Sequence, residues 1–157
     1  MVDPVPAARV DKVVLIGGSG FLGRGLRDRL LSAGYEVVVL GRGPGAQQAG
    51  WREVHWDAQS IGPWAEELDG AVALVHLAGK RVDCRPTATN IAELTRSRVE
   101  SVRLVGSAIA GLSRVPSTWV QLSSLARFGD TGDDIIDEAT PPPDHGPAQQ
   151  AEVCRHC

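Results

Sequence analysis

Short apolar runs alternate along the chain with longer segments whose apolar residues recur at helical spacing. The runs predict five strands, at residues 12–18, 36–42, 52–57, 71–79 and 118–124. Helices are predicted at 20–34 and 88–112, and a short one that begins near Pro63. Strands that alternate with helices in this way predict an α/β fold with a Rossmann-like, doubly wound parallel sheet.

The two longer helices each carry an apolar stripe. In the first, the stripe consists of Phe21, Leu22, Leu26, Leu30 and Ala33. In the second, it consists of Ile91, Leu94, Val102, Val105 and Ile109. Residues 43–50 are expected to form a loop, because glycine, proline and glutamine dominate there.

Three glycines separate the first strand from the first helix. Gly17 allows the tight turn, Gly20 lets the backbone approach a pyrophosphate, and Gly23 lets the helix pack on the sheet. The helix N-terminus then offers free N–H groups to the phosphates. A P-loop is excluded, because no Gly-Lys-Ser/Thr follows. The pattern predicts a dinucleotide site, and a glycine-rich turn without a ligand is the alternative.

The end of the second strand bears on the choice of dinucleotide. An acidic residue about 20 positions after the glycines normally binds the ribose 2′-hydroxyl of NAD. Gly41 stands 18 positions after Gly23, and Arg42 follows it. A glycine leaves room for a 2′-phosphate and a guanidinium pairs with it, so NADP is favoured over NAD. A solvated arginine at a strand end is the alternative.

Composition narrows the classes of partner. The net charge is −3 over 157 residues, and no basic stripe suggests a nucleic-acid partner. No apolar run approaches the ~20 residues that span a bilayer, and the N-terminus shows no secretory signal. A cytoplasmic location is therefore expected. The three cysteines do not suggest a disulfide framework.

Several motifs together resemble one family. They are the glycine turn at 17–23, "WDA" at 56–58, "HLAG" at 76–79, "SRVESVRLV" at 97–105 and "QLSSLARFGD" at 121–130. In order and spacing they are similar to the atypical extended short-chain dehydrogenase/reductases, in the NAD-dependent epimerase/dehydratase family. The resemblance implies an NAD(P)-binding Rossmann domain, here 12–128, and a C-terminal substrate domain that is missing from this chain. Residues 129–157 are then a loop rich in Asp, Gly and Pro, followed by the start of a helix.

The resemblance also implies roles for individual residues. Asp57 and Ala58 would contact the adenine, and Leu77, Ala78 and Gly79 would line the cofactor. Ser123 would lie at the cofactor, and Ser124 would hydrogen-bond the substrate and is the one catalytic candidate. Phe21 and Leu22 belong to the cofactor turn. The alternatives are a turn or helix-cap role for Asp57 and turn roles for both serines. Arg98 lies either near the cofactor or on the surface.

The chain departs from the family in its acid/base pair. Typical members carry Tyr-x-x-x-Lys, in which the tyrosine protonates the substrate oxygen and the lysine lowers its pKa. Here Tyr35 is the sole tyrosine and precedes the site, and Lys80 is the last lysine. The expected function is an NADP(H)-binding domain of an epimerase/dehydratase-type oxidoreductase with an unknown small-molecule substrate. A non-catalytic nucleotide-binding or regulatory module is the alternative.

Two further features of the sequence are the C-terminal cysteine and histidine cluster and the last predicted strand. "CRHC" at 154–157 has only Cys84 and His145 as loose additional ligands, so no metal site is expected. The last predicted strand would be an exposed edge, which makes self-association possible.

Overall fold

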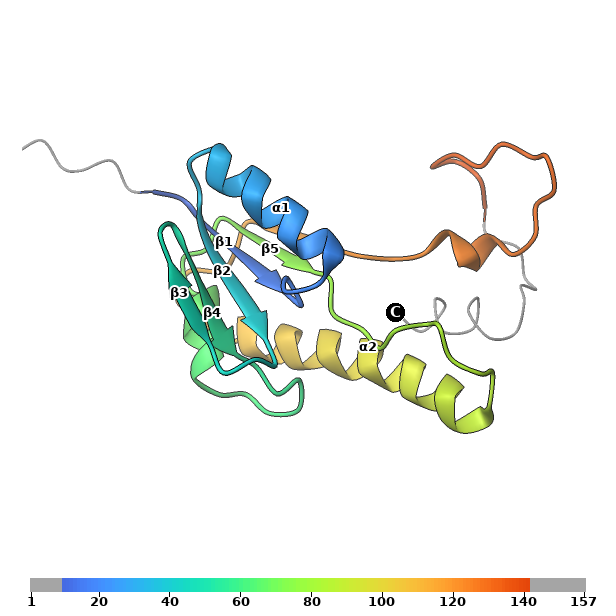
Figure 1. Ribbon diagram of the computed structural model, residues 1–157, viewed down its shortest axis with the longest axis horizontal. Coiled ribbons are helices and arrows are strands. Elements are labelled where there is room, and N and C mark those ends of the chain that lie inside the picture. Colours follow the sequence, from blue (N-terminus) through green and yellow to red (C-terminus); the bar gives the residue numbers. More distant parts are fainter. Residues whose placement is uncertain (1–9, 142–157) are drawn as a thin grey trace, which may run out of the picture.

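The computed structural model describes residues 10–141, in which one mixed sheet lies between helices (Figure 1). Its strands follow the order β3-β4-β2-β1-β5-β6. Their bounds are β1 Lys12–Ile16, β2 Glu36–Gly41, β3 Ala46–Gln48, β4 Trp51–His55, β5 Ala73–His76 and β6 Thr118–Gln121. All neighbours pair in parallel except β3 and β4, which are antiparallel. The expected Rossmann-like fold is confirmed.

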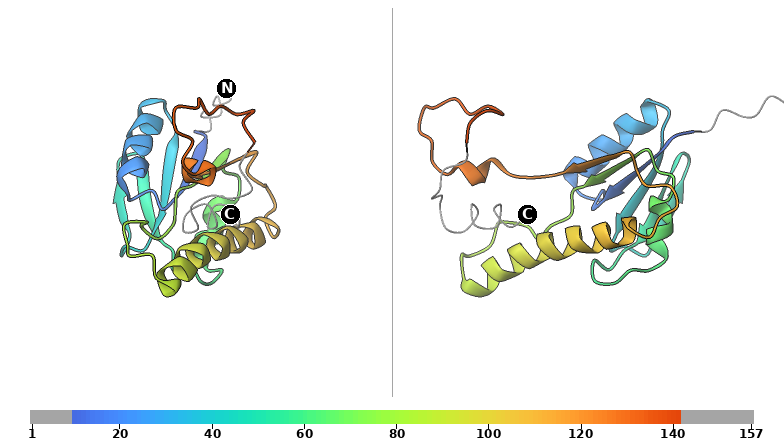
Figure 2. Two further views of the ribbon diagram at one scale, coloured as in Figure 1. Left: turned by 90° about the vertical axis from the view of Figure 1, so that its right-hand side faces the viewer. Right: turned by 180° about the vertical axis from the view of Figure 1, so that it is seen from behind.

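Helices cover both faces of this sheet. The helix α1 (Phe21–Ser32) lies on one face, and α2 (Ala88–Ile109) lies on the other, as Figures 1 and 2 show. The 3-10 helix η1 (Pro63–Leu68) contacts α2, and η2 (Leu125–Phe128) follows β6. Pro63 occupies the first turn of η1, as predicted, where its missing N–H costs nothing.

The core forms two layers because successive strand residues point to opposite faces. Val13, Leu15, Val37 and Val39 pack toward α1, together with Leu26 and Leu30 of that helix. Their neighbours Val14, Ile16, Val38 and Leu40 pack on the opposite face with Trp56, Trp64, Leu68 and Val105. Both faces of β1 and β2 are thus buried, which explains why these strands read as continuous apolar runs.

Two local expectations were wrong. Residues 46–48, expected in a loop, form β3, so the sheet has six strands instead of five. The side chains of β3 are all exposed, and a strand of this kind carries no apolar alternation that a sequence pattern could reveal. In the first helix, Phe21, Leu22 and Ala33 are exposed, because α1 rests on the sheet through Leu26, Leu30 and Leu31.

A hollow of about 350 Å³ lies at the amino ends of the strands and is lined by paired charges. Arg114 Nη2 contacts Asp69 Oδ2 at 2.7 Å, and Arg52 forms ion pairs with Glu36 and Glu67. These pairs join β2, β4, η1 and the segment before β6. The charges in these pairs neutralise one another across the amino ends of the strands.

Beyond β6, residues 122–141 run away from the sheet past the carboxyl ends of the strands (Figure 1). Within 10–141, no helix is long and apolar enough to cross a membrane. The predicted start of a helix at 151–157, together with His145 and "CRHC" at 154–157, lies outside the described residues. The proposed division at residue 128 stays a prediction.

Candidate functional site

The predicted site residues gather at one edge of the sheet, where the parallel strands end. Backbone hydrogen bonds continue the pairing past each strand: Gly17 N–H donates to Leu40 O at 2.8 Å, and Leu77 N–H donates to Ile16 O at 2.8 Å. Trp56 N–H donates to the Gly41 carbonyl at 2.7 Å. The residues that follow β1, β2, β4 and β5 are therefore held beside one another. In open α/β sheets, ligands bind outside this carboxyl edge.

Two of the three glycines in the turn after β1 are required by close packing. Gly17 has a φ of +76°, and a β-carbon there would lie 2.8 Å from Ala78 Cα. Gly23 is buried, and a β-carbon there would overlap the backbone of Gly18. The turn is thus pressed against the end of β5 on one side and against its own helix on the other.

Gly20 differs from the other two glycines. It is the N-cap residue of α1 and has no side chain with which to cap the helix. A β-carbon there would meet only the Gly17 carbonyl oxygen, at 3.7 Å. The protein itself therefore does not need glycine at this position. Since no side chain caps α1, the N–H groups of its first turn are available to an anionic ligand.

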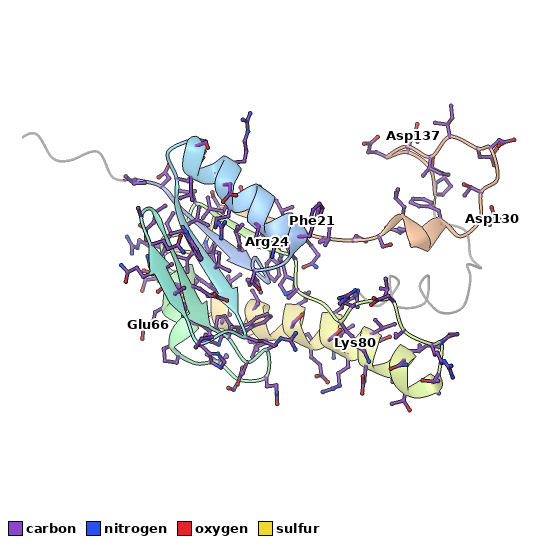
Figure 3. The ribbon with its side chains drawn as sticks, in the orientation of Figure 1. Phe21, Arg24, Glu66, Lys80, Asp130 and Asp137 are labelled. Atoms are coloured by element: carbon purple, nitrogen blue, oxygen red, sulfur yellow. The ribbon has the colours of Figure 1, made fainter. Side chains whose placement is uncertain are left out.

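The first turn of α1 projects beyond the strands. Phe21 is 85% exposed and Leu22 is 56% exposed. Figure 3 shows Phe21 and Arg24 at the same end of α1. Arg24 Nη1 donates to Ser19 O at 3.4 Å, which places a guanidinium beside the turn. This edge thus presents the exposed apolar side chains of Phe21 and Leu22 and the positive charge of Arg24 beside the glycine turn.

The turn after β2 contains a residue that the sequence reading missed. Glu53, on β4, is partly buried, and its Oε1 fills the space in which a β-carbon of Gly41 would lie. The same oxygen would be 3.1 Å from a β-carbon on Gly43. Arg42, between the two glycines, is exposed. The space that Gly41 leaves therefore holds a carboxylate. The β2–β4 register, which pairs Val39 with Glu53, is the signal that could have found it.

Asp57 and Ala58 form the turn after β4. The Asp57 carboxylate accepts from Ser60 Oγ at 2.6 Å, from Gln59 N–H at 2.8 Å and from Ser60 N–H at 3.0 Å. These hydrogen bonds, that of the Ser60 hydroxyl first, lower the pKa of Asp57 to about 2. They use three of about four acceptor positions. Asp57 thus has a turn role, and one position remains for a ligand donor.

Ala58 has a φ of +61° and is the one non-glycine residue in the described chain with a positive φ. A left-handed alanine costs about 1 kcal/mol or more, and such residues cluster at ligand sites. This conformation sets the direction of the backbone at the position that the family resemblance assigns to the adenine.

The loop after β5 is fastened to α2. Arg98 Nη1 donates to Leu94 O and Nη2 donates to Lys80 O, both at 3.1 Å, while Ser97 Oγ accepts from Lys80 N–H at 3.1 Å. A β-carbon on Gly79 would lie 3.2 Å from the Arg98 guanidinium carbon. Of the two roles left open for Arg98, the geometry supports the position near the site, where Arg98 holds the loop that contains Leu77, Ala78 and Gly79.

The side chain of Lys80 is engaged in the same region. Its Nζ donates to Asn90 Oδ1 at 3.0 Å and forms an ion pair with Glu93. The Lys80 ammonium lowers the pKa of Glu93. Lys80 therefore anchors the loop to the first turns of α2 (Figure 3).

His76, at the end of β5, is completely buried. Its ring meets Trp56 edge to face with centroids 6.2 Å apart, and its Nδ1 lies 3.4 Å from Gln121 Nε2. Its Nε2 has no hydrogen-bond partner in the described structure. Burial lowers the pKa of His76 to about 4, so the ring is neutral at neutral pH.

Ser123 and Ser124 follow β6 and are both exposed. They line a cleft of about 680 Å³ together with residues of 125–128 and 136–140. The cleft thus lies along the segment that continues from the carboxyl edge. No group of three or more potential metal ligands occurs among residues 10–141.

The fold and the glycine turn define the class of the protein as a Rossmann-type dinucleotide-binding domain. The model of the NAD dependent epimerase/dehydratase family matches residues 13–150. The chain therefore belongs to that family, and the expected resemblance to extended short-chain dehydrogenase/reductases is confirmed.

Three comparisons describe the similarity. The human epimerase family protein SDR39U1 is 29% identical over 133 residues, which are 83% of this chain and 42% of that protein. Its crystal structure with NADPH has a TM-score of 0.73 at 27% identity, over 92% of this chain and 46% of that chain. MoeE5 in complex with UDP-glucuronic acid and NAD has a TM-score of 0.70 at 27% identity, over 92% of this chain and 46% of that one. The chain thus spans under half the length of these relatives.

Proposed function

We propose that this chain is the NADP(H)-binding domain of an epimerase/dehydratase-type oxidoreductase with a small-molecule substrate. The observation that carries the proposal is the cradle at Gly20. Packing dictates glycine at positions 17 and 23, but no residue of 10–141 fills the space at Gly20. Glycine at such a position suits a ligand that approaches the backbone closely.

In this proposal a dinucleotide lies along the carboxyl edge of the sheet. The pyrophosphate would lie on the first turn of α1, and the groups around it are Gly17, Gly20, Phe21, Leu22, Gly23, Arg42, Asp57, Ala58, Leu77, Ala78, Gly79 and Ser123. The nicotinamide of such a cofactor supplies hydride transfer. The residues of this chain bind and orient it: α1 offers N–H groups, and the loop held by Arg98 closes the side next to β5.

The relatives support a nicotinamide dinucleotide, since one was crystallised with NADPH and another with NAD. Arg42 supports NADP(H) as the preferred form. It is exposed at the end of β2 and has no ion-pair partner among residues 10–141, so its guanidinium is available to a 2′-phosphate.

Ser124 is the catalytic candidate, through a hydrogen bond to a substrate oxygen in the cleft beyond β6. The substrate is a small molecule, and MoeE5 offers a sugar nucleotide as one precedent. A non-catalytic nucleotide-binding module is the second candidate function. It is favoured by the sequence itself, in which no tyrosine follows Tyr35 and no lysine follows Lys80.

Titration of the chain with NADPH and NADH, followed by nicotinamide fluorescence, tests the proposal. Saturable binding of both cofactors, with NADPH bound more tightly, is expected. Equal affinity would contradict the NADP(H) preference. Binding of neither cofactor would contradict the dinucleotide site as a whole.

A further inference from the structure

The turn that joins β2 to β3 encloses a carboxylate. Glu53 lies at the centre of β4, where its backbone pairs with Val39 of β2 on one side and with Ala46 of β3 on the other. Its Oε1 reaches under the turn and approaches both Gly41 and Gly43. Gly45, in the same turn, would place a β-carbon 3.2 Å from Glu53 O. The turn thus folds closely over this one residue.

The Glu53 carboxylate is a charge without a neutralising partner in residues 10–141. No hydrogen bond or ion pair of the described residues involves its oxygens, although the residue is partly buried. Arg52, its neighbour in sequence, points to the opposite face and pairs with Glu36 and Glu67. His55 contacts the turn at the Gly43 carbonyl, 3.1 Å from Nδ1, and not at Glu53.

The position of this charge matters because the end of β2 is where a Rossmann domain holds the adenosine ribose. Domains specific for NAD place a carboxylate there from the end of their second strand. In this chain the second strand ends in Gly41, and a carboxylate reaches the same place from β4. Arg42 and Glu53 therefore act on one site with opposite charges.

We propose that Glu53 is a second determinant of cofactor choice, which opposes Arg42 and limits the preference for NADP(H). This inference rests on the proposed dinucleotide site. A 2′-phosphate carries about −1.5 to −2 charges, so a nearby carboxylate repels it, whereas the neutral 2′-hydroxyl of NAD(H) is not repelled. The chain therefore retains useful affinity for NAD(H) despite the arginine at the end of β2.

Glu53→Gln tests this, because glutamine keeps the shape of the side chain and removes its charge. We expect NADPH affinity to rise about three- to tenfold and NADH affinity to change less than about twofold. The fragments adenosine 2′,5′-bisphosphate and AMP, titrated by calorimetry, should show the same difference. The gain should shrink as salt is raised, since the screening length falls from about 10 Å at 0.1 M to about 3 Å at 1 M.

Glu66→Gln is the matched control. Glu66 is exposed on η1, well away from Phe21 and Arg24 in Figure 3, and its substitution removes the same charge. It should leave the ratio of NADPH to NADH affinity unchanged. Glu53→Ala, a second neutral variant, should raise this ratio in the same direction as glutamine.

Three results would overturn the inference. If both Glu53 variants left the ratio of NADPH to NADH affinity unchanged, Glu53 would have no part in cofactor choice. If Glu66→Gln raised this ratio equally, the effect would come from net charge alone. Binding of neither cofactor by the unsubstituted chain would contradict the proposed function itself, and this inference would fall with it. The first two results leave the proposed function intact, so the failures are distinguishable.

Discussion

The backbone of Gly18 lies directly against Gly23, so closely that a β-carbon on Gly23 would overlap it. This contact fixes how α1 leaves the turn after β1. The angle of the helix, and with it the direction of its first N–H groups, depends on the absence of one carbon atom.

Gly23→Ala should therefore destabilise the domain, by about 1–3 kcal/mol, because the helix must shift to admit the methyl group. Gly25→Ala, two residues further along α1, is the control, since its β-carbon would meet nothing within 4 Å. Alanine there should stabilise by about 0.5–1 kcal/mol through helix propensity. Urea unfolding measures both changes. Equal effects of the two variants would contradict the packing argument.

Gly20→Val should abolish dinucleotide binding without unfolding the domain. The φ of Gly20 is −74°, which valine adopts, and a β-carbon there would come no closer than 3.7 Å to the Gly17 carbonyl oxygen. The free energy of unfolding should change by less than about 1 kcal/mol. Calorimetry with NADPH is the measurement, and Gly25→Val is the control within the same helix. Retained binding would show that the glycine serves only the turn.

Arg42→Ala should weaken NADPH binding about 10- to 100-fold and leave NADH nearly unchanged, because a hydrogen bond to a charged group contributes about 1.5–3 kcal/mol. Fluorescence titration gives both constants. Arg29→Ala, at the other end of α1, removes the same charge away from the site and should change neither. A parallel loss for both cofactors would point to a general electrostatic effect.

Acid should destabilise the domain through His76. Its pKa is about 4 in the folded chain, against about 6.5 when unfolded. Between pH 4 and 6.5 the unfolded state therefore binds more protons than the folded state. The contribution of His76 to the free energy of unfolding is thus fully present above about pH 6.5. It falls by up to about 3 kcal/mol as the pH drops to 4. Urea unfolding across this range measures it.

His76→Leu should flatten that pH dependence, because leucine fills the buried site without titrating. His55→Gln, which changes an exposed histidine, should retain it. The idea would be abandoned if the His76→Leu protein lost stability between pH 6.5 and 4 as steeply as the unsubstituted protein.

The 157-residue chain alone should be catalytically silent. Ser124 would be the only positioned hydroxyl proposed for the substrate, and a serine hydroxyl alone is a poor acid. Orientation of a substrate can contribute ~7–11 kcal/mol to lowering a barrier, and the cleft beyond β6 is open. Sugar, steroid and quinone carbonyls with NADPH, followed at the nicotinamide absorbance, form the test. Turnover that Ser124→Ala abolishes would show a complete active site.

The fold could be predicted from sequence because β1 and β2 are buried on both faces and their apolar runs are continuous. The glycine turn could be predicted because its spacing reports a packing requirement, which the contacts at Gly17 and Gly23 confirm. β3 could not be predicted, since its three exposed residues form a strand only through pairing with β4.

The site was less accessible to sequence reasoning where it depends on side chains from other strands. Gly41 and Arg42 are adjacent in sequence, so the hypothesis that they bear on cofactor choice could be made there, but the expected free space at Gly41 is taken by the Glu53 carboxylate. Glu53 meets them only through the register of β2 and β4. Arg98 likewise reaches Gly79 and Lys80 from nearly three turns inside α2, a contact that no local pattern encodes.

The two edges of the sheet are unequal. One ends in the short reversed strand β3, while the other ends in β6, of which Thr118, Trp119 and Val120 are exposed. A strand that joins this sheet, from a longer chain or from another copy, is therefore favoured beside β6. Such an addition would remodel the surroundings of Ser123 and Ser124 and leave the Gly41 turn untouched. The proposed substrate side of the site is thus next to the edge that can accept a further strand, whereas the turn proposed to select the cofactor follows β2, three strands away from β6.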